Sequence, residues 1–453
     1  MKMKQQIKAQ ALILCMIFLC MGNAFSLRPF SFLKAADRLS YLPGLGAISD
    51  VELAGYLPLV GPDCIKDHCA SNTGNLFYWF VESRTKSKDA PLVLWLNGGP
   101  GAASLYGFFM ENGPYSVSTD GRLTKRKFSW TEKAHYLMID QPAGVGFSYG
   151  TATTYANEAE AMAQLYHALT LFFQRHPELA AKDLYLAGQS YAGKYLPQLA
   201  IRILAGNTAG EKIHLKGLLI GDGWVNPRLQ QRANMEMAYS HGLIDRTTRK
   251  KVEALYQQCT QEIDKATPSS RQANQVCSKI QDLIRKVSGD LNLANIATDK
   301  ELDDSAMIQY LNSPEVRKAL HVDPRIKKFK SFSKMASDLL EIGEQDSVAP
   351  LYPQLLAAGV RVLIYNGLED AKDSNFISAD LWLEALNWPG KKQFANAPTC
   401  VWRTAGQVAG YAKAAEGLTQ VKIRGAGHIA PADQPERLLD LLHRFINNQS
   451  FCG

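Results

Sequence analysis

Apolar runs of strand length recur along this chain, and glycine follows several of them. A continuous apolar run of about 4–8 residues is typical of a strand that is buried on both faces. Residues 158–174 instead carry apolar side chains at helical spacing and predict a helix. The predicted strands are residues 76–81, 91–96, 183–187, 216–223, 361–365 and 421–424. Their alternation with helical segments predicts an α/β protein with a mostly parallel central sheet flanked by helices.

The pattern changes between residues 226 and 322, where helical stretches rich in Gln, Lys and Arg replace the buried strands. Residues 266–270 combine proline with two serines and predict a loop inside this region. Strand and helix signals resume near Arg361. We therefore expect one enlarged α/β unit rather than several separate domains.

The most informative turn follows the strand at residues 183–187, where the chain reads Gly188-Gln189-Ser190-Tyr191-Ala192-Gly193. G-x-S-x-G between a strand and a helix is typical of a nucleophile elbow, a turn so tight that flanking positions must be glycine. Such a turn would expose the Ser190 hydroxyl. It would also aim the free N–H groups at the start of the next helix toward the same point. An ordinary surface turn is the alternative.

Three further segments favour the elbow. The strand at residues 91–96 runs into a glycine loop at 97–101, whose bare backbone N–H groups could face an oxyanion. Asp370 follows the strand at residues 361–365, and His428 follows the strand at 421–424 through a glycine-rich turn. The order glycine loop, Ser, Asp, His is that of the α/β-hydrolase architecture.

These segments also resemble the successive motifs of the serine carboxypeptidases, especially the vitellogenic-carboxypeptidase-like branch. The resemblance runs from about Tyr56 to Asn447. It implies an α/β-hydrolase core in two parts, residues 25–225 and 323–453, with a helical cap inserted at residues 226–322. It implies neither a cofactor nor a metal ion. The motifs that carry it are residues 95–101, 139–149, 189–193, 311–322, 408–411 and 425–428.

We expect Ser190 to be the nucleophile and His428 its base, because His428 alone among the histidines lies in such a turn. Asp370 is the expected partner of His428. Family members usually carry an acid directly after the glycine of this turn, whereas Leu368 stands there in this chain. The vitellogenic branch shares that departure and favours Asp370 over its neighbours Glu369 and Asp373.

The N–H groups of Gly99 and Tyr191 are the expected oxyanion donors. The resemblance further implies that Asn97 and Glu111 bind the carboxylate at the C-terminus of the substrate, and we place Gly98 of the same loop beside them. The third carboxylate-binding position of the family is a glutamate, but this chain has Gln189.

The first 24 residues carry lysines, then an apolar run at 11–21, then Gly22-Asn23-Ala24. This order predicts a signal peptide cleaved after Ala24; an uncleaved anchor is the alternative, although the run is short for a bilayer span. Loss of the three leader lysines lowers the net charge from +7 to +4. That value is too small to indicate nucleic-acid binding.

Removal of the leader would take Cys15 and Cys20 with it and leave six of the eight cysteines. An exported chain with an even number of cysteines is expected to form disulfides, and six cysteines allow 15 pairings. We favour Cys64–Cys69 and Cys259–Cys277, which are close in the sequence, and Cys400–Cys452 by elimination. A zinc site is the competing idea, but the chain lacks CxxC and HxxxH spacings.

Together these features predict an exported serine carboxypeptidase that removes C-terminal residues from peptides or proteins through an acyl-enzyme. The expected compartment is extracellular, periplasmic or lysosome-like, and no membrane span is expected in the mature chain. An acyltransferase or esterase of the same fold is the first alternative. An inactive binding or protective protein is the second, which the presence of both Ser190 and His428 disfavours.

Overall fold

The computed structural model describes residues 37–60, 72–150 and 154–452. The predicted signal peptide and the Cys64–Cys69 pair lie outside these ranges. Within them the chain forms one large sheet and two small hairpins, β1–β2 (Tyr41–Leu42, Gly46–Ala47) and β6–β7 (Tyr115–Val117, Leu123–Lys125).

The large sheet has 11 strands in the order β13-β14-β15-β12-β11-β10-β5-β8-β4-β3, with β9 paired to β4. Its centre, from β15 to β8, is parallel, and the strands at both edges are antiparallel. In chain order the strands are β3 Glu52–Val60, β4 Asn72–Val81, β5 Leu92–Leu96, β8 His135–Ile139, β9 Tyr149–Gly150, β10 Leu184–Gln189, β11 Leu215–Gly221, β12 Arg361–Gly367, β13 Cys400–Thr404, β14 Gln407–Ala415 and β15 Leu418–Ile423.

The central strands are buried on both faces, as their continuous apolar runs predict. In β5, Leu92, Leu94 and Leu96 enter one hydrophobic core, whereas Val93 and Trp95 enter the other. The same alternation of side chains holds in β10 and β12. It follows from the two-residue period of a strand.

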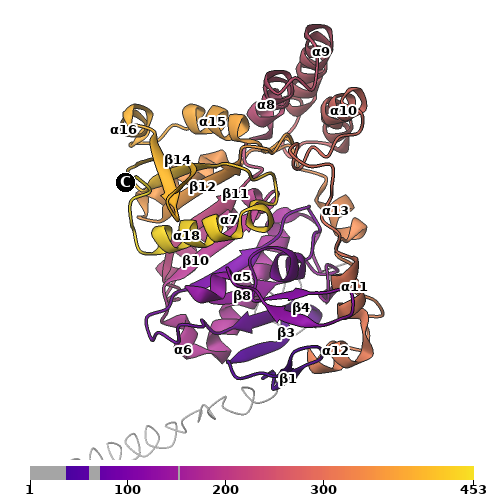
Figure 1. Cartoon of the computed structure of the whole chain (residues 1–453), viewed down its shortest axis with the longest axis vertical. Coiled ribbons are helices and arrows are strands. Elements are labelled where there is room, and N and C mark those ends of the chain that lie inside the picture. Colours follow the sequence, from indigo (N-terminus) through magenta and orange to yellow (C-terminus); the bar gives the residue numbers. More distant parts are fainter. Residues whose placement is uncertain (1–36, 61–71, 151–153, 453) are drawn as a thin grey trace, which may run out of the picture. The chain divides into compact units, whose positions relative to one another are not determined.

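Helices cover both faces of the sheet (Figure 1). Helices α5, α7, α14 and α15 contribute to one core, and α4, η2, α11, α12 and α18 contribute to the other. The bounds of the helices are α4 Ser104–Tyr106, η2 Gly107–Glu111, η3 Trp130–Glu132, α5 Glu158–Arg175, α6 Pro177–Ala180, α7 Ala192–Thr208, α8 Pro227–Ser240, α9 Arg246–Ile263, α10 Arg271–Val287, α11 Ser305–Asn312, α12 Pro314–Ala319, α13 Lys334–Leu340, η4 Ala349–Leu351, α14 Tyr352–Ala357, α15 Phe376–Ala385, α16 Lys391–Asn396, α17 Ala430–Asp433 and α18 Pro435–Ile446.

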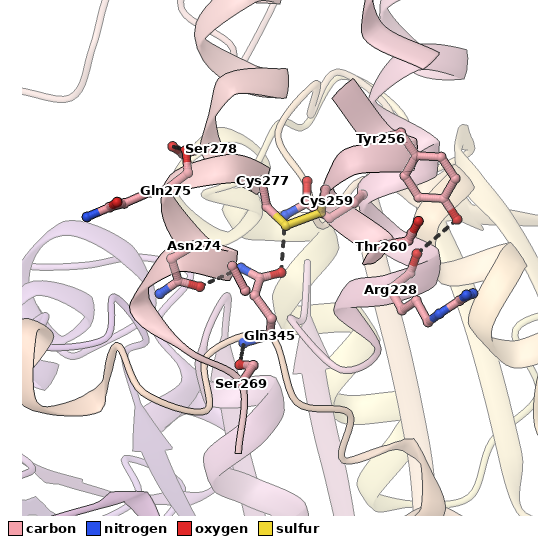
Figure 2. The surroundings of a disulfide bond; sticks show 12 residues. Arg228, Tyr256, Cys259, Thr260, Ser269, Asn274, Gln275, Cys277, Ser278 and Gln345 are labelled. Carbon is pink, nitrogen blue, oxygen red and sulfur yellow. Dashed lines mark hydrogen bonds between the residues drawn. A yellow bond between two sulfur atoms is a disulfide. The ribbon is translucent and has the colours of Figure 1, made fainter. Parts of the chain in front are cut away.

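Helices α8, α9 and α10 fall in the region where the sequence predicts a helical insertion, and Figure 1 shows them grouped at the top of the view. They share a separate hydrophobic core. The disulfide Cys259–Cys277 joins α9 to α10, and Gln345 contributes polar contacts beside it (Figure 2). A third core and a covalent link allow this helical group to pack with limited help from the sheet.

Both described disulfides, Cys259–Cys277 and Cys400–Cys452, match the predicted pairs. The second one ties β13 to the segment after α18. Among the described residues, no helix combines the length and the apolar character that a membrane crossing requires.

Candidate active site

Ser190 occupies a strained turn between β10 and α7. Its φ is 59°, in the left-handed region, and its N–H donates to the Gly221 carbonyl at 2.9 Å. A Cβ at Gly193 would lie 2.8 Å from the Trp224 nitrogen, so only glycine fits there. Residues other than glycine adopt such a φ only where the surroundings enforce it, and strain of this kind clusters at active sites.

The glycine loop after β5 touches this turn directly. A side chain at Gly98 would place its Cβ 2.4 Å from the Tyr191 nitrogen and 3.0 Å from the Ser190 Cβ. Within the described part of the chain, the N–H groups of Gly99 and Tyr191 donate to no protein acceptor. The Tyr191 N–H, next to Ser190, and the Gly99 N–H, one residue after the contact at Gly98, are therefore both available as donors, as an oxyanion site requires.

His428 and Asp370 meet at the same edge of the sheet, because β15 and β12 are parallel neighbours. The His428 Nδ1 lies 2.9 Å from the Asp370 Oδ2, and both side chains are buried. The Lys372 N–H donates to the other Asp370 oxygen at 2.8 Å. Among the hydrogen bonds of the described residues, His428 has none with Glu369, Asp373 or Ser190.

A second buried carboxyl, Asp222, lies beside Asp370, and the sequence analysis did not single it out. Its Oδ1 accepts from the Gly367 N–H at 3.1 Å and from the Asn366 side chain at 3.3 Å. Burial, followed by the nearby Asp370 charge, raises the pKa of Asp222 well above its usual range. The sequence signal that could have indicated Asp222 is its position directly after the apolar run of β11, the strand that pairs with β12.

Asn97, Glu111 and Gln189 form a buried group, called here the carboxyl cluster. The Glu111 Oε1 accepts from the Asn97 side chain at 2.8 Å and from the Gln189 side chain at 3.2 Å. The Asn97 Oδ1 is fixed in turn by the Trp95 indole and the Gly107 N–H. The structure thus brings together the three side chains expected to bind the substrate carboxylate, with Gly98 between them and Ser190.

The Glu111 carboxyl accepts from two side-chain amides, and the positive charge of Arg126 acts on it without a hydrogen bond between them among the described residues. Burial raises its pKa to about 8, even though the Asn97 hydrogen bond opposes that shift. The Glu111 Oε2 and the Gln189 Oε1 are buried and have no partner in the described structure. A protonated Glu111 can donate one hydrogen bond from Oε2, so the carboxyl cluster suits an anionic ligand.

No group of three His, Cys, Asp or Glu side chains in residues 37–60, 72–150 and 154–452 is arranged to hold a metal ion.

Comparison with known proteins identifies the family. The family model for serine carboxypeptidases matches residues 46–448. A human protein, "Probable serine carboxypeptidase CPVL", is 37% identical over 390 residues, which cover 82% of this chain and 80% of the relative. The venom serine carboxypeptidase of Apis mellifera is 35% identical over 395 residues, covering 83% of this chain and 82% of the relative.

The fold matches that of a solved carboxypeptidase. The crystal structure of the prohormone-processing carboxypeptidase Kex1 from Saccharomyces cerevisiae has a TM-score of 0.81 and 26% identity, covering 92% of this chain and 96% of the other. The match confirms the predicted α/β-hydrolase fold. Family model, relatives and fold agree, and this chain belongs to the serine carboxypeptidase family.

Proposed function

We propose that this protein is an exported serine carboxypeptidase that releases C-terminal residues from peptides through an acyl-enzyme. The observation that carries the proposal is the carboxyl cluster, because Gln189 is bonded to Glu111 and directly precedes Ser190. A nucleophile next to a buried carboxylate site acts on the last peptide bond of a chain. The membership of the family supports the same activity.

In the first half-reaction the Ser190 Oγ attacks the carbonyl carbon while the His428 Nε2 takes the hydroxyl proton. The oxyanion of the tetrahedral intermediate accepts from the N–H groups of Gly99 and Tyr191. His428 then gives its proton to the leaving amine, and the C-terminal residue departs. Asp370 holds the imidazole so that Nε2 faces the nucleophile.

In the second half-reaction, water attacks the acyl-enzyme. His428 takes a proton from the water and returns one to the Ser190 Oγ when the ester bond breaks. The enzyme returns to its starting state, and the shortened peptide leaves with a new C-terminal carboxylate. Attack by another alcohol or amine in place of water would make the protein an acyltransferase.

A blocked dipeptide, its C-terminal amide and the corresponding ester test the proposal. We expect the free acid to be cleaved with kcat/KM at least about tenfold above the amide, because a hydrogen bond to a charged group contributes about 1.5–3 kcal/mol. Equal rates for acid and amide would contradict a carboxylate site. Turnover of the ester alone would favour the esterase or acyltransferase, and no turnover would favour a binding protein.

Export is proposed from residues 1–24, and two disulfides in the described chain support it. Expression in a secretory host should give a mature N-terminus at Phe25; retention in a membrane pellet would indicate an uncleaved anchor. We also propose that the chain belongs with the vitellogenic branch. The acid bonded to His428 is Asp370, whose distance along the chain from Gly367 matches that branch.

A further inference from the structure

The two proposed oxyanion donors belong to different segments, so their separation depends on contacts that join those segments. Gly99 lies in the loop after β5, and Tyr191 lies at the start of α7. Donors of this kind must be held within fractions of an ångström, and a misplacement of about 1 Å can cost about 10²-fold in rate. The structure contains a second connection between them, besides the contact at Gly98.

That connection is a segment called here the strap, residues 331–347, which includes α13. Its first part pairs with the glycine loop, since the Ala103 N–H donates to the Ser331 carbonyl and the Ser333 N–H donates to the Gly101 carbonyl, each at 2.9 Å. A Cβ at Gly101 would lie 2.6 Å from the Ser333 oxygen. The strap is therefore packed directly on the loop that carries Gly99.

Its last part is joined to the other donor. The Lys194 Nζ, on the first turn of α7, donates to the Gly343 carbonyl of the strap and lies 3.5 Å from the Glu158 Oε2 of α5. The same Glu158 oxygen accepts from the Tyr191 hydroxyl at 2.5 Å. In addition, the Trp224 indole donates to the Glu344 carbonyl, and the Trp224 N–H donates to the Ser190 carbonyl.

Stability alone does not explain a buried ion pair at this place. Lys194 is 2% exposed, and the Glu158 side chain is 13% exposed. The desolvation of two charges often exceeds their attraction, and apolar replacements are often neutral or stabilising. The helices α5 and α7 already pack through apolar side chains such as Leu165 and Leu199. What the pair adds is a fixed position for the Tyr191 ring and for the Gly343 carbonyl.

We propose that Lys194 and Glu158 are positioning residues that set the separation of the Gly99 and Tyr191 donors, acting through the Tyr191 hydroxyl and the strap. The inference rests on the proposed acyl-enzyme function. It differs from a role in substrate binding, because neither side chain belongs to the carboxyl cluster.

The decisive variant is Lys194→Ala. A cavity of about 740 Å³ borders Glu158, Lys194 and Gly343, so a small cation can enter the space that the lysine leaves. We expect kcat to fall about 10- to 100-fold at nearly constant KM. This loss is smaller than the 10²- to 10³-fold fall in kcat that is typical when one oxyanion donor is removed, because here the donors are only displaced. Propylammonium should restore part of kcat in Lys194→Ala and none in the wild type.

Inhibitors separate positioning from folding. A peptide aldehyde forms an adduct with Ser190 whose oxygen occupies the oxyanion site, so its affinity should fall by the same factor as kcat. A free amino acid, bound only at its carboxylate, should keep its affinity. Arg444→Ala breaks a partly buried ion pair with Asp440 elsewhere in the fold and serves as the control with unchanged kcat.

Tyr191→Phe removes one oxygen only and decides the matter if Lys194→Ala fails to fold. We expect a kcat loss of about three- to tenfold, again with a matching loss of aldehyde affinity. Wild-type kcat in both variants, or a change confined to KM, would overturn the inference. If the wild-type protein itself forms no aldehyde adduct, the proposed function fails instead.

Discussion

Two buried carboxyls near Ser190, Asp370 and Glu111, differ in what faces them. Asp370 accepts hydrogen bonds on both oxygens, from Lys372 and from the His428 ring. Glu111 accepts two bonds on one oxygen and none on the other, and burial raises its pKa to about 8. A fully bonded carboxylate suits a charge that orients a base. A carboxyl with one unbonded oxygen can instead stay protonated and donate a hydrogen bond to a bound anion.

The largest effect is expected at Asp370. Asp370→Asn should lower kcat by about 10⁴-fold without unfolding the protein, because an amide favours the wrong tautomer of the histidine. Steady-state kinetics with a blocked dipeptide would measure the loss.

Glu369→Gln and Asp373→Asn are the matched controls, since both acids lie within three residues of Asp370 and neither is bonded to His428. We expect each to stay within about threefold of wild type, because neither substitution removes a hydrogen bond to His428. An inactive Asp373→Asn beside an active Asp370→Asn would reverse the assignment.

The next largest effect is expected at Glu111. Glu111→Ala should raise KM for a free-acid peptide by about 10- to 100-fold, because the substrate carboxylate would lose a hydrogen bond to a charged group, which contributes about 1.5–3 kcal/mol to binding. Hydrolysis of an ester without a C-terminal carboxylate should change little. Equal losses with both substrates would mean that Glu111 supports the fold of the site rather than the ligand.

A smaller effect on pH dependence is expected at Gln189. Glu111 remains protonated below its pKa of about 8, so the wild-type KM should stay nearly flat from pH 5 to 7. In Gln189→Glu the two neighbouring carboxyls would titrate as a pair, and the first of their two protons would come off at lower pH than the second, which leaves a negative charge that repels the substrate carboxylate. KM of that variant should therefore rise about tenfold over the same range. Superimposable KM profiles would mean that Gln189 does not affect carboxylate binding.

The smallest effect on activity is expected at Glu52, a buried carboxyl bonded to Trp79 and Tyr115 away from the site. Burial raises its pKa from 4.5 to about 7, so its contribution to stability is full below pH 4.5 and is lost as pH rises through 7. Glu52→Gln should remove that loss and give a higher Tm than wild type at pH 8, with the same kcat/KM. A Tm difference that does not change between pH 5 and 8 would contradict the raised pKa.

The sequence predicted the central strands β5, β10, β11, β12 and β15, but not β8, because continuous apolar runs and glycine punctuation are local signals. It did not predict β13 and β14, since segments such as Gln407–Ala415 are rich in alanine and contain glycine, which strands seldom favour. Pairing with β15 decides their conformation.

The residues of the site likewise fall into those that local sequence signals predict and those that only the folded structure shows. Ser190, His428 and Asn97 stand in motifs that can be read from the chain, whereas Asp222, Lys194 and Glu158 stand in no motif with a known mechanism. Their importance comes from burial and from partners up to 149 residues away, such as Gly343 for Lys194. Contacts of that kind are a property of the folded chain.

Because β15 lies near the C-terminal end of the chain, the proposed catalytic residues come together only late in folding. Ser190 leaves the ribosome long before His428, because His428 follows β15. The His428 backbone also depends on an earlier segment, since its N–H donates to the Ala294 carbonyl. The proposed nucleophile Ser190 therefore lacks its proposed base His428 until β15 has inserted between β12 and β14. By the proposed mechanism, a nascent or truncated chain that ends before β15 should therefore have no carboxypeptidase activity.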